Sequence, residues 1–272
     1  MVFTLTDFDK AKAKGKKNCT KGLACGAGCI SKTKKCKQKM GAGGGAYADH
    51  VSDPDNLEKG AESSEGKSIS QGIPDLSISD FGKYLKGDLP KEQMQAIKDA
   101  INRPLVDPEK AANHKPNMTR EDAEKYVEGS AYGKESMWHG NSDKVANSIF
   151  EDGADPSKNE RGLYGRGVYF ATTKEAAEEY AESAFSNNAK ANLIEAKFAI
   201  KNPFVTDGAG MIKLASDISK LHDEGFLADS KFISDYVKAK GHDSIHITSR
   251  GYLVALDKAQ VVSVSNKTIF ED

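Results

Sequence analysis

The second half of the sequence predicts an α+β domain. From residue 132 onward, short apolar segments typical of strands alternate with longer segments that have helical spacing. The chain finishes with three strand-like segments, Ser244–Ile247, Tyr252–Leu256 and Gln260–Val264, and much of the sheet is expected to be antiparallel. Hydrophobic residues make up 38% of the chain and charged residues 29%, which is the composition of a protein with a packed core.

The first part of this domain predicts a strand followed by a helix. Ser136–His139 is expected to form the strand. Ser142 is a residue type that caps helix N-termini, and the helix that it opens is expected to bury Val145 and to end at Gly153.

The middle of the domain repeats this alternation. Val168–Ala171 is an apolar strand, and Thr172 and Glu175 have the spacing of a capping box that opens an alanine-rich helix. Leu193–Ile200 alternates in polarity, which predicts a strand with one buried face. Asp229 is expected to cap a further helix.

Three segments are expected to precede the domain. The helical segment has helix starts at Pro90 and Thr119, and the linker opens on a glycine-rich run whose composition cannot bury a core. In chain order, the predicted segments are a basic cysteine-rich module (1–40), a flexible linker (41–74), a helical region (75–131) and the α+β domain (132–272).

Charge is distributed unevenly along the chain. The net charge is −1, but residues 1–40 hold eleven lysines against Asp7 and Asp9. Such a basic segment is either a solvated tail or an arm that contacts nucleic acid. The sequence has no run of 18 apolar residues, and its first residues are too few and too acidic for a signal peptide, so we expect a cytoplasmic protein without a membrane partner.

Four cysteines lie close together in the basic segment: Cys19, Cys25, Cys29 and Cys36. In a reducing compartment, clustered cysteines are more often metal ligands than disulfides. Four thiolates form a tetrahedral zinc site, so zinc is the expected ligand here. The spacing is not that of a Cys-x2-Cys ribbon, and disulfides or free thiols remain alternatives.

A glycine-rich run at residues 162–167 precedes the strand Val168–Ala171. A dinucleotide-binding turn of the Rossmann type needs a strand before the glycines and a helix after them, which is the reverse of this order. No Gly-Lys-Ser/Thr follows, which excludes a phosphate-binding P-loop. A turn that leads into a strand is the simplest reading of the glycines alone.

Aromatic residues and a histidine surround this run at defined spacings. His139 and Gly140 follow Trp138 and lie about thirty residues before Tyr169, and Tyr180 follows eleven residues later on the alanine-rich helix. Taken singly, each of these residues is more often a packing residue of a core than part of a binding site.

As a set, these residues resemble the nicotinamide pocket of the poly-ADP-ribose-polymerase-like ADP-ribosyltransferases. The resemblance covers roughly residues 132–272 and implies split antiparallel sheets with flanking helices, and NAD as the substrate. It implies that Tyr169 and Tyr180 stack on the nicotinamide ring, that Gly140 binds the carboxamide through its main chain and that His139 binds the adenosine ribose. His139 and Tyr169 would be the catalytic residues. The residues that would contact NAD are His139, Gly140, Gly167, Tyr169, Ala177 and Tyr180.

Two positions depart from the family pattern. Gly251 stands where the polymer-forming members have a catalytic Glu, and Glu160 is a candidate substitute for it. Ala177 stands where family members often have a Ser that also holds the carboxamide. One neutral hydrogen bond contributes about 1 kcal/mol, so its loss is expected to weaken NAD binding about fivefold to tenfold.

The expected function is therefore mono-ADP-ribosylation of a macromolecule, a host protein, by a phage or bacterial effector. One alternative is an NAD- or ADP-ribose-binding module without catalysis, which the missing Glu favours. Another is a structural or packaging protein that acts through residues 1–40. The RNA 2′-phosphotransferases share the fold, and Arg161, Arg166 and Arg250 leave that activity open.

Overall fold

The computed structural model describes residues 23–25, 28–30, 72–160, 162–185, 190–222 and 226–271. The chain divides into two compact units, residues 1–65 and 66–272. In the first unit, β1 (Leu23–Cys25) and β2 (Gly28–Ile30) form an antiparallel pair. The predicted zinc site lies outside the described residues, because Cys19 and Cys36 are not described and the side chains of Cys25 and Cys29 are not described either.

The second unit combines eight α-helices with a seven-stranded sheet among its described residues, which confirms the α+β class. The helices are α2 (Ile78–Lys86), α3 (Lys91–Asn102), α4 (Pro108–Ala112), α5 (Arg120–Tyr126), α6 (Asp143–Asp152), α7 (Lys174–Phe185), α8 (Gly208–Ser219) and α9 (Phe226–Ala239). The strands are β3 (Met137–Ser142), β4 (Val168–Ala171), β5 (Lys190–Phe198), β6 (Pro203–Thr206), β7 (Ser244–Ile247), β8 (Tyr252–Ala255) and β9 (Val261–Glu271).

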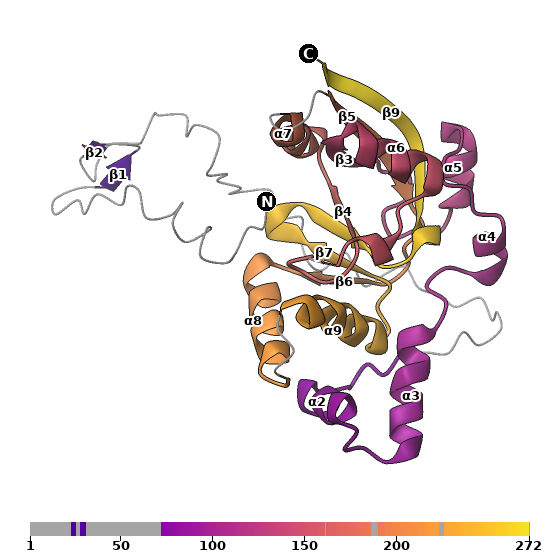
Figure 1. Cartoon of the computed structure of the whole chain (residues 1–272), viewed down its shortest axis with the longest axis vertical. Coiled ribbons are helices and arrows are strands. Elements are labelled where there is room, and N and C mark those ends of the chain that lie inside the picture. Colours follow the sequence, from indigo (N-terminus) through magenta and orange to yellow (C-terminus); the bar gives the residue numbers. More distant parts are fainter. Residues whose placement is uncertain are drawn as a thin grey trace. The chain divides into compact units, whose positions relative to one another are not determined.

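The sheet has the order β6-β7-β8-β4-β3-β5-β9 (Figure 1). All neighbours are antiparallel except β6 and β7, which run parallel. Strands β3 and β4 share a single register pair, Trp138 opposite Ala171, whereas β3 and β5 share six pairs and β4 and β8 share four. The sheet is therefore split into two halves that meet at this narrow seam.

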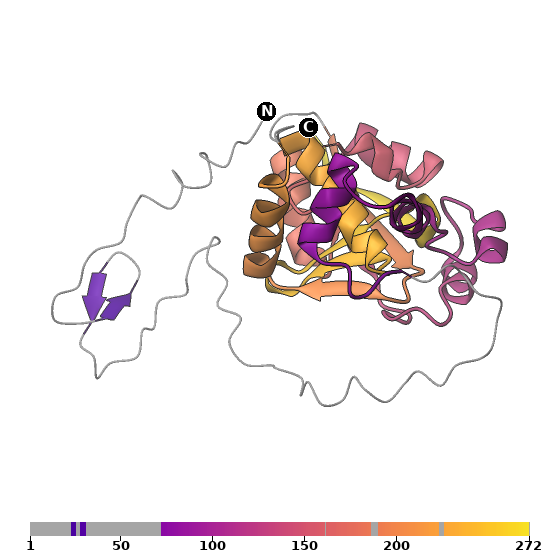
Figure 2. The ribbon, with the colours of Figure 1, turned by 90° about the horizontal axis from the view of Figure 1, so that it is seen from below.

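Two main hydrophobic cores pack against opposite faces of β8, since Val254 belongs to one core and Leu253 and Ala255 to the other. Below β6 and β7 in Figure 1, helices α8 and α9 lie against the sheet, with α2 and α3 beyond them; Figure 2 is seen from the side of α2 and α3. This core joins Phe81 and Ile97 of the early helices to Ile233 and Ile245 of the domain. On the other side, Phe170 and Phe198 pack edge to face at 4.9 Å between ring centroids, under α6.

Residues 75–131 thus share buried surface with the domain that follows them. Helix α5 shows why: Ala123 is buried with Ala199 and Val262, and the Tyr126 hydroxyl donates to the carbonyl of Ala259 at 2.6 Å. At the start of the helix, Arg120 pairs with Glu195 of β5 at 2.7 Å. The apolar and charged contacts together fix α5 against β5 and β9.

Local sequence signals located most elements and misplaced some of their ends. Thr119 caps α5 as predicted, since its side chain accepts from the Asp122 N–H. Helix α7 begins one residue later than the capping-box spacing indicates, because Thr173 rather than Thr172 accepts from the helix, from the Ala176 N–H at 3.3 Å. The main-chain N–H of Thr172 instead donates to Gly251, at the end of the sheet.

Three further predictions about burial and capping were wrong. Val145 is 40% exposed, because α6 turns Ala146 and Ile149 toward the core. Helix α9 begins at Phe226, which places Asp229 in its first turn. Strand β5 is buried on both faces from residue 191 to 198. Helix α6 packs with Ile194 on one face and α7 with Leu193 on the other, so the alternation in polarity does not mark a solvent face. Among the described residues, no helix has the length and apolar composition needed to cross a membrane.

Candidate active site

His139 bridges the two halves of the sheet at the seam. Its Nδ1 lies 2.7 Å from the main-chain oxygen of Tyr169. Because a carbonyl only accepts, Nδ1 carries the proton and Nε2 is the acceptor. Asn141 Nδ2 lies 3.4 Å from Nε2 and donates to it. The imidazole therefore supplies a hydrogen bond between β3 and β4, which share only one register pair. Its acceptor nitrogen, Nε2, lies beside the seam.

Burial determines the charge of this imidazole. Desolvation lowers the pKa of His139 below its ordinary value, and the hydrogen bond to Tyr169 opposes that shift only in part. The ring is consequently neutral near pH 7. A neutral imidazole with Nδ1 protonated has one acceptor, Nε2, which receives the long bond from Asn141. A ligand hydroxyl that takes the place of Asn141 would donate to this nitrogen.

Gly140 lies where β3 touches helix α7. A Cβ at this position would meet the main-chain oxygen of Ala177 at 1.8 Å, which no side chain can relieve. The close approach brings α7 against the strand, and Gly140, which is buried, has no side chain between its main chain and the helix. Ala177 is itself 1% exposed, so a small residue is required on the helix as well.

Tyr169 is held by the glycine-rich loop that precedes its strand. The phenol hydroxyl donates to the carbonyl of Gly165 and accepts from the N–H of Tyr164, both at 2.8 Å. A Cβ on Gly162 would meet this hydroxyl at 2.6 Å, which accounts for a glycine there. Burial raises the pKa of Tyr169 well above its ordinary value, so the ring stays neutral. The loop thus fixes the orientation of the aromatic ring.

Tyr180 extends from α7 toward the start of β8. Its side chain is 51% exposed, and its hydroxyl forms a short hydrogen bond with the hydroxyl of Tyr252. The two rings lie 6.0 Å apart between centroids at an interplanar angle of 62°. The tyrosine pair therefore joins the helix to the sheet at the rim of the seam.

These side chains enclose one cavity of about 190 Å³. Its lining is aromatic and polar, and consists of Trp138, His139, Gly140, Asn141, Tyr169, Phe170, Ala171, Ala177, Tyr180 and Tyr252. A cavity of about 150 Å³ suffices for a benzene ring. The space thus accepts one substituted aromatic ring, and the remainder of any dinucleotide would lie outside it.

Five of the six residues predicted to contact NAD line this cavity, and Gly167 does not. A Cβ on Gly167 would meet Val254 Cγ1 at 2.4 Å and the Ala255 oxygen at 2.6 Å. A glycine at this position therefore allows the close contact between the start of β4 and β8, and its predicted contact with NAD stays a prediction.

Gly251 has a backbone conformation that disfavours any other residue. Its φ is +61°, in the left-handed region, and an added Cβ would lie 2.9 Å from the Thr172 hydroxyl. Among the described residues, the lining of the cavity includes no carboxylate, and the predicted substitute Glu160 is exposed and outside it. Arg250 lies near enough to act on Tyr180 electrostatically.

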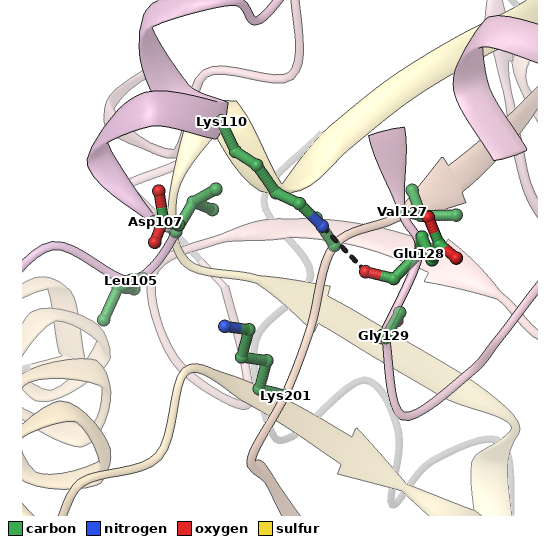
Figure 3. Close-up of a pocket in the computed structure, with 10 residues that line it drawn as sticks. Leu105, Asp107, Lys110, Val127, Glu128, Gly129 and Lys201 are labelled. Carbon is green, nitrogen blue, oxygen red and sulfur yellow. Dashed lines mark hydrogen bonds between the residues drawn. The ribbon is translucent and has the colours of Figure 1, made fainter. Parts of the chain in front are cut away.

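A second hollow, beside α4, is much smaller. It has a volume of about 10 Å³, enough for about one water. Lys110 reaches across it to the carbonyl of Glu128 at 2.7 Å, with Lys201 on the other side (Figure 3). Burial and then the charge of Lys201 lower the pKa of Lys110. This hollow is too small for a ligand of the size that the first cavity accepts.

Five lining residues were not among the predicted contacts, and two of these, Asn141 and Tyr252, lie outside the sequence segments that predicted the site. Tyr252 was assigned to a strand, but its place beside Tyr180 depends on the pairing of β8 with β4, where Tyr252 stands opposite Ala171. Asn141 follows the His-Gly pair directly and was not considered. Asn141 could have been found from its position next to Gly140 in the sequence. Tyr252 is found only when the register of β8 against β4 is known.

A comparison with known protein families identifies the family of this domain. A family model described as "ADP-Ribosyltransferase in polyvalent proteins" matches residues 101–270, beginning within α3. Among curated proteins, no relative matches the chain. ADP-ribosyltransferase domains are transferases that use NAD as substrate. The match covers more than half of the chain, and the protein belongs to the ADP-ribosyltransferase family of polyvalent proteins.

Proposed function

We propose that this protein transfers a single ADP-ribose unit from NAD to a macromolecule, with a protein as the acceptor. The observation that carries the proposal is that His139, Gly140, Tyr169 and Tyr180 line one cavity of single-ring size at the split in the sheet. Its dimensions admit only one ring of NAD, because the whole dinucleotide is far larger than this space. We assign the nicotinamide end to it on the tyrosines and the Gly140 main chain.

The lining supplies what a nicotinamide ring needs. The ring is flat and positively charged in NAD, and a stacked aromatic face contributes about 1 kcal/mol or more when water is excluded. Tyr169 and Tyr180 provide such faces. The carboxamide needs one donor and one acceptor, which the main chain of Gly140 provides. His139 Nε2 then accepts from a ribose hydroxyl, which takes the place of the Asn141 amide.

The reaction follows from this arrangement. The bond between ribose C1′ and the pyridinium nitrogen breaks, its electron pair stays on the nitrogen, and neutral nicotinamide leaves. The ribose passes through an oxocarbenium-like state, as in glycoside hydrolysis. A nucleophile of the acceptor forms the new bond to C1′ and releases a proton to solvent. With no carboxylate among the described lining residues to activate a ribose hydroxyl, we expect transfer to stop after one unit.

Labelled NAD tests the proposal. The full chain is incubated with a bacterial lysate and NAD that carries the label in its adenylate phosphate, and released nicotinamide is quantified in parallel. We expect covalent label on protein and an equal amount of free nicotinamide. Tyr180→Ala serves as the inactive variant, because a half-exposed side chain can be removed without leaving a core cavity.

The same experiment separates the second candidate, an NAD-binding module without catalysis. The observation that favours this candidate is that the described residues lining the cavity include no carboxylate, since a carboxylate would stabilise a developing ribose cation. Binding of NAD without released nicotinamide would support it. Label that persists in Tyr180→Ala would contradict the placement of the ring in this cavity.

A further inference from the structure

We infer that Tyr252 is a positioning residue, whose hydroxyl holds the Tyr180 ring against the nicotinamide of NAD. The inference rests on the proposed function, since it assigns the ring to the cavity described above. It adds a residue to that proposal. Tyr252 is not part of the motif that predicted the site, and it is not one of the positions, Gly251 and Ala177, that differ from the family pattern.

The first step of the argument is that Tyr180 needs support. It lies in the second half of α7, more than half of its side chain is exposed, and its ring has no other aromatic contact among the described residues than Tyr252. An exposed tyrosine samples several rotamers, and fixing one of them on ligand binding reduces affinity. A stacking wall is effective only where its rotamer is held beforehand.

The second step is that Tyr252 is rigidly placed. It is the first residue of β8, paired with Ala171 on one side and with Ile247 on the other. The carbonyl of Gly251, next to it, accepts from the Thr172 N–H at 2.8 Å. The strand and the turn before it therefore fix where the Tyr252 hydroxyl lies, and the hydrogen bond transmits this position to Tyr180.

The third step concerns charge. Burial, followed by the bond to Tyr252, raises the pKa of the Tyr180 hydroxyl well above its ordinary value. The hydroxyl pair is thus a neutral clamp near pH 7, with one donor and one acceptor used between the two rings. It occupies the rim of the cavity beside Gly251, where the polymer-forming relatives place a carboxylate.

A double-mutant cycle on the full chain tests the inference. Tyr180→Phe, Tyr252→Phe and the double variant keep both rings and remove the hydroxyls singly and together. Dissociation constants are measured by calorimetry for NAD and for ADP-ribose, which lacks the nicotinamide ring. Trp138, the only tryptophan of the chain, lines the cavity and reports ring entry by its fluorescence. Tyr236→Phe, whose hydroxyl donates to Leu76 in the distant core, is the matched control.

We expect Tyr252→Phe to weaken NAD binding about fivefold, the value of one neutral hydrogen bond, and to leave ADP-ribose binding unchanged. The double variant should be no weaker than either single variant, because both hydroxyls act through one shared bond. Tyr236→Phe should change neither affinity.

Three outcomes would overturn the inference. Unchanged NAD affinity in Tyr252→Phe shows that the hydroxyl pair does not position the ring. An equal loss for NAD and ADP-ribose shows a general structural effect. Additive losses in the double variant show that the hydroxyls act separately. A wild-type chain that binds no NAD refutes the proposed function itself, and is distinguished from these outcomes because it needs no variant.

Discussion

Single glycines and alanines set how closely helix α7 approaches the seam. The main chain of Gly140 contacts that of Ala177, and Ala181 one turn later is fully buried against the same strand. Small residues at these positions bring the helix that carries Tyr180 within reach of the sheet. The geometry of the cavity therefore depends on absent side chains as much as on aromatic ones.

Gly140→Ala should abolish NAD binding and lower the melting temperature by several degrees. The new methyl would lie 1.8 Å from the Ala177 oxygen, so α7 has to move away from β3. Calorimetry with NAD and a thermal melt measure the two effects. Gly82→Ala is the control, since its methyl meets only the flexible end of Leu221, in the core of the early helices. Full NAD affinity in Gly140→Ala would refute the assigned contact.

Ala177→Ser should strengthen NAD binding about fivefold, because a hydroxyl at this point of the cavity adds one hydrogen bond to the carboxamide. Ala181→Ser adds the same group to the same helix outside the cavity and should bring no gain. A gain in both variants would mean that the effect lies in the helix and not in the ligand contact.

Tyr169→Ala should reduce NAD affinity at least tenfold, since it removes one stacking face and releases the glycine-rich loop. Tyr169→Phe keeps the face and loses only the two loop bonds. The difference in affinity between the two variants therefore measures the ring alone. Equal affinities in wild type and Tyr169→Ala would remove nicotinamide from this position.

At the scale of elements, α5 is tied to the sheet by a buried charged group. Glu195 is 9% exposed at its side chain, accepts from the Ser136 hydroxyl at 2.6 Å and pairs with Arg120. Burial raises the pKa of Glu195, but the bonds from Ser136 and Arg120 outweigh it, and the net pKa lies below the ordinary value of 4.5. A carboxylate with a depressed pKa stabilises the fold above that ordinary value.

The stabilisation by Glu195 should therefore be lost as the pH falls below about 4.5. Urea unfolding at a series of pH values measures it. Glu195→Gln should be less stable than wild type at neutral pH, and the difference should shrink in acid. Glu121→Gln, an exposed change on the same helix as Arg120, is the control and should keep the wild-type profile.

Sequence patterns were sufficient for elements whose signals are local. The cap at Thr119 and the apolar strand Val168–Ala171 depend on neighbouring residues, and both were found. Long-range packing decided the rest. Strand β5 is buried on both faces because α6 and α7 cover them, and Tyr252 joined the cavity only through strand register. The motif residues were sufficient to predict the cavity, whereas the residue at its rim, Tyr252, could be placed only from the pairing of β8 with β4.

At the scale of the whole molecule, nucleic-acid binding and NAD binding are expected to belong to different compact units and can be tested separately. Residues 66–272 contain the cavity, and residues 1–40 carry the eleven lysines. We expect the full chain to bind nucleic acid with an affinity that falls steeply with salt. The logarithm of the association constant should decrease by about 0.7 to 0.9 per phosphate contact for each tenfold rise in salt concentration. A chain of residues 66–272 should lose this binding and keep its NAD affinity. Filter binding and calorimetry give the two constants.

Equal nucleic-acid affinity in the two chains would assign any such contact to the second unit. A loss of NAD affinity on truncation would show that the first unit contributes to the site. Chelation of zinc, followed by the same nucleic-acid assay, tests the expected metal at the four cysteines. An unchanged nucleic-acid affinity would indicate that the segment binds through its lysines alone.

The imidazole of His139 links two half-sheets through its hydrogen bond to Tyr169. Strands β3 and β4 otherwise share one register pair. Replacing this histidine would remove an acceptor from the proposed NAD site and would also weaken the connection between the two half-sheets. Loss of activity on replacing it has two inseparable explanations, and dissection of the chemistry has to begin with the tyrosines.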